Sequence, residues 1–128
     1  MKKQQLRFEI ELDFTLIGVS CHIKDYRFVW LLNKTLKSNF FKTKQFYFND
    51  NECFFPQFEY PMELSTAYIF ANRSTTGYLV KTKPQVDYWL KIEDSHNEQT
   101  QKWKEEIKTI PHVLVAYEEV AKKVKEQF

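Results

Sequence analysis

The stretch that decides the fold is Leu16-Ile17-Gly18-Val19-Ser20-Cys21-His22-Ile23-Lys24-Asp25-Tyr26, because the hydrophobic pattern changes where it begins. In residues 6–14, just before it, apolar side chains occupy the even positions and residues 7, 9, 11 and 13 are charged. This alternation is typical of a strand with one buried face. Residues 16–19 are apolar on both faces, as in the centre of a sheet. We therefore predict one strand over residues 6–21, with Ile17 and Val19 buried and polar side chains gathered at its far end.

A helix is expected directly after this strand. Asp25 is a suitable N-cap, since its carboxylate can accept a backbone N–H of the first turn, and the helix is predicted to continue to about residue 38. Asn39 is expected to take the left-handed conformation that ends the helix. The buried stripe predicted for this helix consists of Phe28, Val29, Leu32 and Leu36.

The middle of the chain has the pattern of short strands joined by turns. Strands are predicted over residues 40–48, 53–60, 67–71 and 86–92, with turn residues at 49–52 and 72–77. Pro56 lies inside the second of these strands and cannot donate to a sheet ladder. That strand is therefore expected to be an edge strand or to be bulged.

The last third of the chain predicts a further helix and strand. Ser95 and Glu98 fit a capping box at the start of a helix. The residues expected to mark its buried face and its end are Trp103, Ile107 and Pro111. Residues 113–117 favour a strand followed by a terminal helix, because β-branched residues cluster after Pro111, although one helix over 112–127 also fits the spacing.

Length and composition predict a single α+β domain over residues 1–128. A chain of 128 residues can bury a core of its own, and an aromatic content of 17% favours half-buried sheet surfaces. Helices and strands in this order predict a mainly antiparallel sheet with two or three helices packed on one face.

Several functional classes are disfavoured by what the sequence contains. Its two glycines are isolated, whereas a phosphate-binding loop needs clustered glycines. Its two cysteines are too few for a disulfide scaffold, which favours a reducing compartment. Charged residues interrupt every apolar run that could form a signal or cross a bilayer, so we predict a cytoplasmic protein without a membrane partner. A net charge of +2 indicates a mixed surface.

Two stretches resemble a known family. The first runs from Leu16 to Arg27 with Trp30 and Leu32, and the second comprises Ile69-Phe70-Ala71-Asn72-Arg73-Ser74, Gly77 and Val86-Asp87-Tyr88. Together they resemble the bacterial family named for an IPExxxVDY motif, over most of the chain and in the same order. The first half of the motif differs, because Val80-Lys81-Thr82 stands in place of Ile-Pro-Glu. That family has no assigned activity, so the resemblance implies a small intracellular bacterial protein and supplies no mechanism.

The end of the first strand carries residues that could perform thiol chemistry. A histidine beside a cysteine can lower the thiol pKa, and a carboxylate can orient the imidazole, which would give Cys21, His22 and Asp25 the roles of an enzyme site. Adjacent strand residues point to opposite faces, however, so a buried structural Cys21 is preferred. No metal site is predicted, because only Cys21 and His22 lie close together in sequence, and no cofactor is implied.

A second polar group is expected from strands that lie farther along the chain. If the strands around residues 70 and 88 are neighbours, the Arg73 guanidinium can bind the Asp87 carboxylate. Asn72 and Ser74 could then satisfy its remaining donors, with Tyr88 adjacent. We favour an ion pair that fixes the turn over a ligand site, because turn networks commonly use these residue types.

RNA binding is an alternative function. The sequence Phe46-Tyr47-Phe48 lies beside Lys42 and Lys44, a chemistry that suits base stacking and phosphate contacts on a sheet surface. Alternate members of that triplet must face the core, however, and the motif of a ribonucleoprotein-type strand is absent. Nucleic acid is therefore disfavoured as a partner.

The preferred hypothesis is a noncatalytic protein-interaction or regulatory module. Phe54, Phe55 and Trp89 could leave aromatic surface that a partner covers, since Trp89 is predicted on the polar side of its strand. The alternative for Trp89 is that a helix of the same chain covers it. The partner is an unidentified protein, or a second copy of the chain that pairs through a sheet edge.

Overall fold

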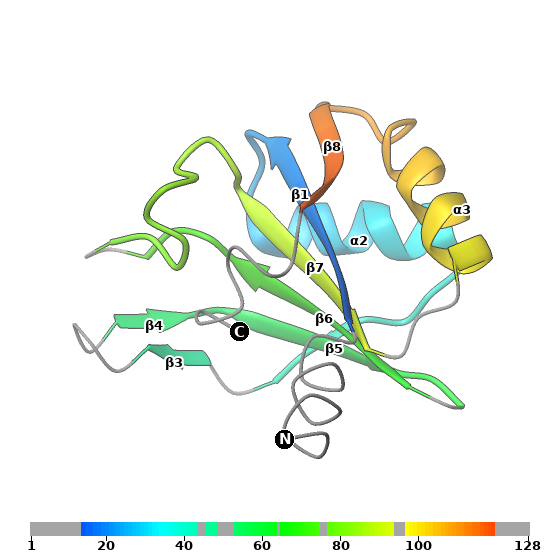
Figure 1. Ribbon diagram of the computed structural model, residues 1–128, viewed down its shortest axis with the longest axis horizontal. Helices are drawn as coiled ribbons and strands as arrows, with labels where there is room; N and C mark the ends of the chain where they lie inside the picture. Colours follow the sequence, from blue (N-terminus) through cyan, green and yellow to red (C-terminus); the bar gives the residue numbers. More distant parts are fainter. Residues whose placement is uncertain are drawn as a thin grey trace, which may run out of the picture.

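The computed structural model describes residues 14–43, 46–48, 53–63, 65–74, 77–93 and 97–119. Its helices and strands are β1 (Phe14–Cys21), α2 (Asp25–Leu36), β2 (Phe41–Lys42), β3 (Phe46–Phe48), β4 (Cys53–Phe55), β5 (Gln57–Pro61), β6 (Thr66–Ala71), β7 (Tyr88–Glu93), α3 (Asn97–Ile107) and β8 (Val113–Glu119). Six strands form one antiparallel sheet in the order β2-β5-β6-β7-β1-β8, and β3 pairs with β4 separately (Figure 1). Both helices pack on the same face of the sheet, which confirms the predicted α+β fold.

Strand β1 lies inside the sheet, as its two-sided hydrophobic pattern predicts. It pairs antiparallel with β7 on one side and with β8 on the other. Ile17 is 0% and Val19 1% exposed on the helix side, while Leu16 is 0% exposed on the opposite side. The prediction that the chain enters the centre of the sheet here is therefore confirmed for residues 14–21. Residues 6–13 lie outside the described part of the chain.

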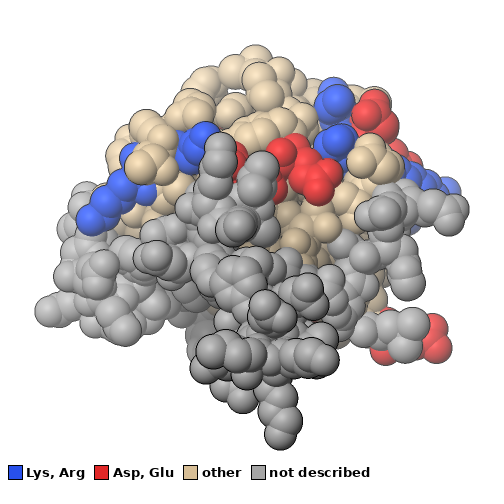
Figure 2. Space-filling view, viewed as in Figure 1, with Lys and Arg blue, Asp and Glu red and all other residues tan. Residues whose placement is uncertain are grey.

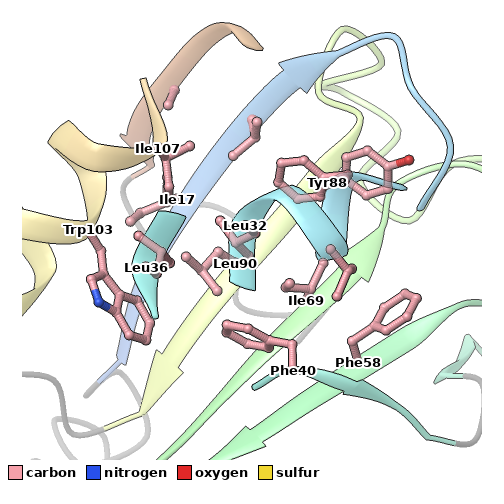
Figure 3. Packing of buried hydrophobic residues seen from close by; sticks show 14 of the residues in the cluster. Ile17, Leu32, Leu36, Phe40, Phe58, Ile69, Tyr88, Leu90, Trp103 and Ile107 are labelled. Carbon is pink, nitrogen blue, oxygen red and sulfur yellow. The ribbon is translucent and has the colours of Figure 1, made fainter. Parts of the chain in front are cut away.

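The larger core lies between the sheet and the two helices. Helix α2 buries the four predicted residues Phe28, Val29, Leu32 and Leu36. Figure 3 shows Leu32 and Leu36 of α2 beside the sheet side chains Ile17 and Leu90, with Trp103 and Ile107 of α3 at one end of the cluster. The burial of Trp103 and Ile107 confirms the predicted inner face of α3.

A second, smaller core covers the opposite face of the sheet, and it corrects the prediction for two aromatic residues. Trp89 and Phe55 were expected to form interaction surface, but each is 0% exposed. Among the described residues, Trp89 packs with Leu79 and Val80 from the segment between β6 and β7, and its cluster contains no residue of α2 or α3. Of the three aromatic residues expected at the surface, only Phe54 remains largely exposed, at 51%.

Gly18 allows this second core to close over β1. A Cβ atom at this position would lie 2.9 Å from Cε1 of Tyr117 and 3.0 Å from Cζ3 of Trp89. Those two rings meet edge to face, with centroids 6.5 Å apart, across the backbone of Gly18. A glycine is required here because aromatic rings from both neighbouring strands use the space above it.

Both ends of α2 differ from the prediction. Lys24 is the N-cap and Asp25 the first helical residue, whose Oδ1 accepts a hydrogen bond from the backbone N–H of Tyr26 at 2.6 Å. At the other end Lys37, not Asn39, adopts the left-handed conformation, with φ of 57°. The side chain of Asn33 explains the early stop, because its amide holds both the N–H and the C=O of residue 40 at 2.8 and 3.0 Å.

The strands predicted over residues 40–48 and 53–60 are each divided in two. The β3–β4 hairpin pairs Phe46 with Phe55, whereas β2 pairs with β5 in the main sheet. Pro56 separates β4 from β5, and its carbonyl accepts a hydrogen bond from the N–H of Ala71 at 3.1 Å. The interruption at Pro56 agrees with the prediction, but β5 is not an edge strand, because it lies between β2 and β6.

The C-terminal elements follow the preferred prediction where the structure describes them. Helix α3 ends at Ile107, earlier than Pro111, and residues 113–119 form strand β8. The expected capping residue Ser95 and the terminal helix lie outside the described residues. Within the described residues, neither helix combines the length and hydrophobicity needed to cross a membrane.

Candidate functional site

A pocket of about 480 Å³ opens where β1 ends and β7 begins. The antiparallel register pairs Val19 with Tyr88, which brings the loop between β1 and α2 beside the start of β7. We call this the β1–β7 pocket; its lining residues are Cys21, His22, Ile23, Lys24, Asp25, Pro56, Ala71, Arg73, Asp87 and Tyr88. Six of the eight residues predicted as a polar cluster therefore meet in one place. The volume lies within the range of small-ligand sites.

Asp87 is the structural centre of the pocket. Its backbone N–H donates to the carbonyl of Val19 at 2.9 Å, which extends the β1–β7 ladder by one residue. Its side chain is 5% exposed, and Oδ2 accepts the backbone N–H of Cys21 at 2.8 Å. Oδ1 accepts a hydrogen bond from Nη2 of Arg73. A buried carboxylate with a cation and a backbone donor is well compensated, so Asp87 ties the end of β1 to the chain that follows β6.

Arg73 forms the outer half of this ion pair. An isolated β-bridge between Arg73 and Tyr78 holds its backbone, and its side chain is 53% exposed. The hydrogen bond to Asp87 raises the pKa of the guanidinium above its usual value, so Arg73 remains a cation. The predicted Arg73–Asp87 contact is present, and it joins two segments on either side of the turn.

Asn72 and Ser74 lie outside the pocket, which corrects the expectation that they satisfy the donors of Arg73. Asn72 is 0% exposed, and its Nδ2 donates to the carbonyls of residues 83 and 86 at 2.9 and 2.8 Å. Its Oδ1 accepts the N–H of Val80 and the indole N–H of Trp89, both at 2.9 Å. Ser74 closes the turn instead, through its backbone N–H to the carbonyl of Gly77 at 2.8 Å.

The environment of Cys21 is opposite to that of an activated nucleophile. Burial, and then the negative charge of Asp87, raise its pKa from the ordinary 9.0 to about 12, against the effect of a hydrogen bond from the backbone of Ile23. The residue is 1% exposed and belongs to the helix-side core. Reactive cysteines require a depressed pKa and access to solvent. The structure therefore supports the preferred interpretation of Cys21 as a buried structural residue.

His22 points away from the core, as alternation along a strand requires. Its side chain is 74% exposed, and its Nδ1 lies 4.0 Å from Oδ2 of Asp87. That distance exceeds a hydrogen bond. The imidazole thus lies at the rim of the pocket and Cys21 faces the core, so the structure does not form the catalytic pair considered from the sequence.

Tyr88 forms the inner wall of the pocket. Its ring stacks on Phe28 of α2, with centroids 4.5 Å apart and an interplanar angle of 8°. Its hydroxyl donates to the carbonyl of Ile23 at 2.5 Å. Burial raises the pKa of this phenol well above its usual value, with a smaller contribution from nearby acidic groups. Tyr88 thereby fixes the loop between β1 and α2 as a neutral hydrogen-bond donor.

The residues described by the structure form no group of three or more histidine, cysteine, aspartate or glutamate side chains that could hold a metal ion. The side chain of Cys53 and the residue His96 lie outside the described part of the chain. The pocket contributes two carboxylates, Asp25 and Asp87, and each accepts a backbone hydrogen bond.

Two exposed aromatic residues next to the pocket were missed by the reasoning from sequence. Tyr26 is 68% and Trp30 61% exposed, on the outer face of α2. They are one turn apart, and Nζ of Lys34 lies 5.3 Å from the centre of the Trp30 ring. The signal was present in the pattern, because the predicted buried stripe of α2 places positions 26, 30 and 34 on the opposite side of the helix.

Comparison of the chain with protein-family models and with curated proteins finds no match. The resemblance to the IPExxxVDY family therefore remains a prediction based on the quoted residues. Of its Val86-Asp87-Tyr88 segment, Asp87 and Tyr88 line the pocket, whereas Val86 packs into the second core.

Proposed function

We propose that this chain is a noncatalytic protein-interaction module, and that its contact surface is the outer face of α2 beside the β1–β7 pocket. We define the α2 outer face as Tyr26, Arg27, Trp30 and Lys34, all of which are exposed. The observation that carries the proposal is the exposure of the two large rings at 68% and 61%. Tyrosine, tryptophan and arginine are the residues most enriched at the energetic centres of protein interfaces.

The chemistry of the pocket supports binding over catalysis. Cys21 is a neutral buried thiol at physiological pH, and the carboxylate of Asp87 is occupied by Arg73 and a backbone N–H. A free, buried thiol also fits the cytoplasmic location that we propose.

Nothing in the described residues favours the alternative of RNA binding. Lys42 is exposed, but the side chains of residues 46–48 lie outside the description. Figure 2 shows Lys and Arg residues and Asp and Glu residues in small groups of both signs on one face of the molecule. A surface that binds RNA through phosphates would instead collect positive charge.

Site-specific photo-crosslinking tests the proposal. A benzoylphenylalanine at position 30 should give a discrete crosslinked adduct in cells that express the protein, and Tyr26→Ser should reduce its yield. The matched control carries the same probe at position 54, where the native phenylalanine is also exposed, at 51%, but lies on strand β4. Equal adducts at both positions, or none at position 30, would show that the α2 outer face is not a contact surface.

One edge of the sheet supports a second candidate, self-association. Among the strands that the structure describes, β8 is the terminal strand of the main sheet, and Leu114 and Val115 on it are 66% and 51% exposed. An edge strand with exposed apolar residues is a template for pairing with another strand. We propose that two copies pair antiparallel through β8. Sedimentation velocity should then show a dimer that Leu114→Lys dissociates and Lys102→Gln does not; a monomer at high protein concentration would contradict this pairing.

A further inference from the structure

In the β1–β7 pocket, the acidic side chains have hydrogen-bond partners within the protein, whereas the basic side chains are exposed. Its two carboxylates are already hydrogen bonded within the protein, Asp87 to Arg73 and Cys21, and Asp25 to the N–H of Tyr26. Asp87 is also almost fully buried. Apart from the second carboxylate oxygen of Asp25, what the pocket presents to a ligand is therefore mainly a set of donors.

Those donors come from three side chains. Arg73 is 53% exposed, and its only hydrogen-bond partner among the described residues is Asp87, which leaves most of its five N–H groups for a ligand. His22 is 74% exposed at the rim, and Lys24 is exposed beside it. The N-terminal end of α2 lies at the same wall, and its dipole adds positive potential.

The remaining walls are apolar. Ile23, Pro56, Ala71 and the ring of Tyr88 surround the space next to Arg73. A short methylene chain that ends in an anionic group matches this combination, because its apolar part can pack on these walls while a planar carboxylate receives the guanidinium fork.

We propose that the pocket binds a carboxylate of the protein partner on Arg73, and that the partner contacts this chain through an acidic segment that continues along α2. This inference rests on the proposed function and names the chemistry of the partner. Asp25 is the only acidic residue in α2, whereas Arg27 and Lys34 lie among the exposed rings of its outer face. A segment with carboxylates and an apolar or aromatic residue complements both the pocket and the helix.

An acidic polypeptide fits this surface better than a nucleic acid or an anionic membrane. The pocket and the α2 outer face together offer four Lys and Arg side chains, at positions 24, 27, 34 and 73. A nucleic-acid site with about 6–10 phosphate contacts would need more basic side chains than these four. Recognition of anionic lipid usually relies on a dense cluster of basic residues, and here the four are separated by aromatic and neutral ones.

Titration followed by amide NMR tests the inference with a defined probe. The probe is an acetylated and amidated tetrapeptide of three glutamates and one phenylalanine, and the control peptide has glutamine at each glutamate position. The glutamate peptide should bind saturably and at least about tenfold more tightly than the control, since charged hydrogen bonds are about twice as strong as neutral ones. Its shift changes should centre on Ile23, Asp25 and the side chain of Arg73. Equal binding of the two peptides would overturn the inference.

Variants separate the pocket from general charge effects. Arg73→Lys keeps a cation beside the buried Asp87 but removes the fork, and it should weaken the glutamate peptide about tenfold. Lys24→Gln leaves the Arg73–Asp87 pair intact and should weaken binding of the glutamate peptide severalfold. Lys102→Gln removes an exposed lysine from α3 and should leave binding unchanged. Equal loss in all three variants would indicate nonspecific electrostatics and overturn the inference, as would tighter binding to phosphatidylserine vesicles or single-stranded RNA than to the peptide.

The crosslinking experiment distinguishes failure of this inference from failure of the proposed function. An adduct at position 30 that forms equally in the wild type and in Arg73→Lys, together with no binding of the glutamate peptide, would retain the interaction module and reject the acidic partner. Peptide binding that depends on Arg73 without any adduct at position 30 would support the pocket and reject the α2 outer face as the contact surface.

Discussion

Replacement of Asn72 by alanine should be among the most destabilising single changes in this protein. Asn72 makes four side-chain hydrogen bonds at 2.8 to 2.9 Å, which use both donors of its amide and both lone pairs of its oxygen. The change would leave two carbonyls and two N–H groups without these partners, including the indole N–H of the fully buried Trp89.

The expected magnitude follows from the burial of those groups. Three of the four hydrogen bonds are buried, and the one to the carbonyl of residue 83 is partly buried, where water can replace the lost donor. An unsatisfied buried polar group costs about 1–3 kcal/mol. Local relaxation recovers part of the sum, so we expect a loss of about 4 kcal/mol in the free energy of unfolding. This is a large share of the total stability of an ordinary domain, about 5–15 kcal/mol.

Urea denaturation monitored by circular dichroism measures this loss, with Asn39→Ala at an exposed asparagine as the matched control. The control should change the free energy of unfolding by less than about 0.5 kcal/mol. Hydrogen exchange should also accelerate at the amide of Val80 and the indole of Trp89, because both donate to Asn72. A loss below about 1 kcal/mol for Asn72→Ala would refute the argument that this amide holds the segment between β6 and β7.

Three further perturbations follow from the structure. Gly18→Ala should lower the free energy of unfolding by about 1–3 kcal/mol, because the new methyl group would meet Tyr117 at 2.9 Å and Trp89 at 3.0 Å; thermal denaturation that matches the wild type would contradict this. The pKa of Cys21 is about 12 in the folded state, against 9.0 ordinarily. The neutral thiol therefore contributes fully to the free energy of unfolding below pH 9, and this contribution falls as pH rises towards 12. The stability advantage of the wild type over Cys21→Ala should therefore shrink above pH 9 in urea titrations, and a constant difference would argue against the raised pKa. Lys37→Gly should stabilise the protein by about 1 kcal/mol, since Lys37 has φ of 57° at the end of α2, and a lower melting temperature would disprove that reason.

The order and type of the main elements were predictable because each rests on a periodic hydrophobic pattern. The two-sided run at residues 16–19 placed β1 inside the sheet, and a stripe at helical spacing identified the inner face of α2. The ends of the elements were less predictable, since they depend on single side chains from other segments. Asn33, for example, accepts the backbone N–H of residue 40, and the left-handed residue is Lys37 where the sequence predicted position 39.

The position of Trp89 shows why alternation along a strand predicts faces but not exposure. Trp89 does point to the side opposite Leu90, as the pattern requires. The sequence left two candidates to cover that side, a partner and a helix of the same chain, whereas the described residues that pack there include Leu79 and Val80 from a segment without a repeating pattern. Asn72 holds Leu79 and Val80 there by accepting both of their backbone N–H groups, a tertiary contact that no periodic pattern predicts.

Most residues of the candidate site could be predicted from the sequence, but the role of each residue could not. Cys21 and Asp87 are 66 positions apart, and their contact depends on the pairing of β1 with β7. That pairing presents the backbone N–H of Cys21 to the carboxylate of Asp87, while the thiol faces the core. The adjacent Cys21 and His22 thus suggested thiol chemistry. The register of the sheet shows instead that the Asp87 carboxylate binds the backbone N–H of Cys21 and not its thiol.

This division of roles supports recognition as the use of the pocket. An acid or base that takes part in catalysis needs a proton or a lone pair that the fold leaves available. Here both oxygens of Asp87 accept hydrogen bonds within the protein, and the hydroxyl of Tyr88 donates a hydrogen bond to the carbonyl of Ile23. The groups that remain available are the exposed donors of Arg73 and the side chains around the start of α2, and fixed donors of this kind suit the binding of an anion. The inner half of the pocket is therefore hydrogen bonded within the protein, and its outer half carries the exposed side chains to which we assign the partner.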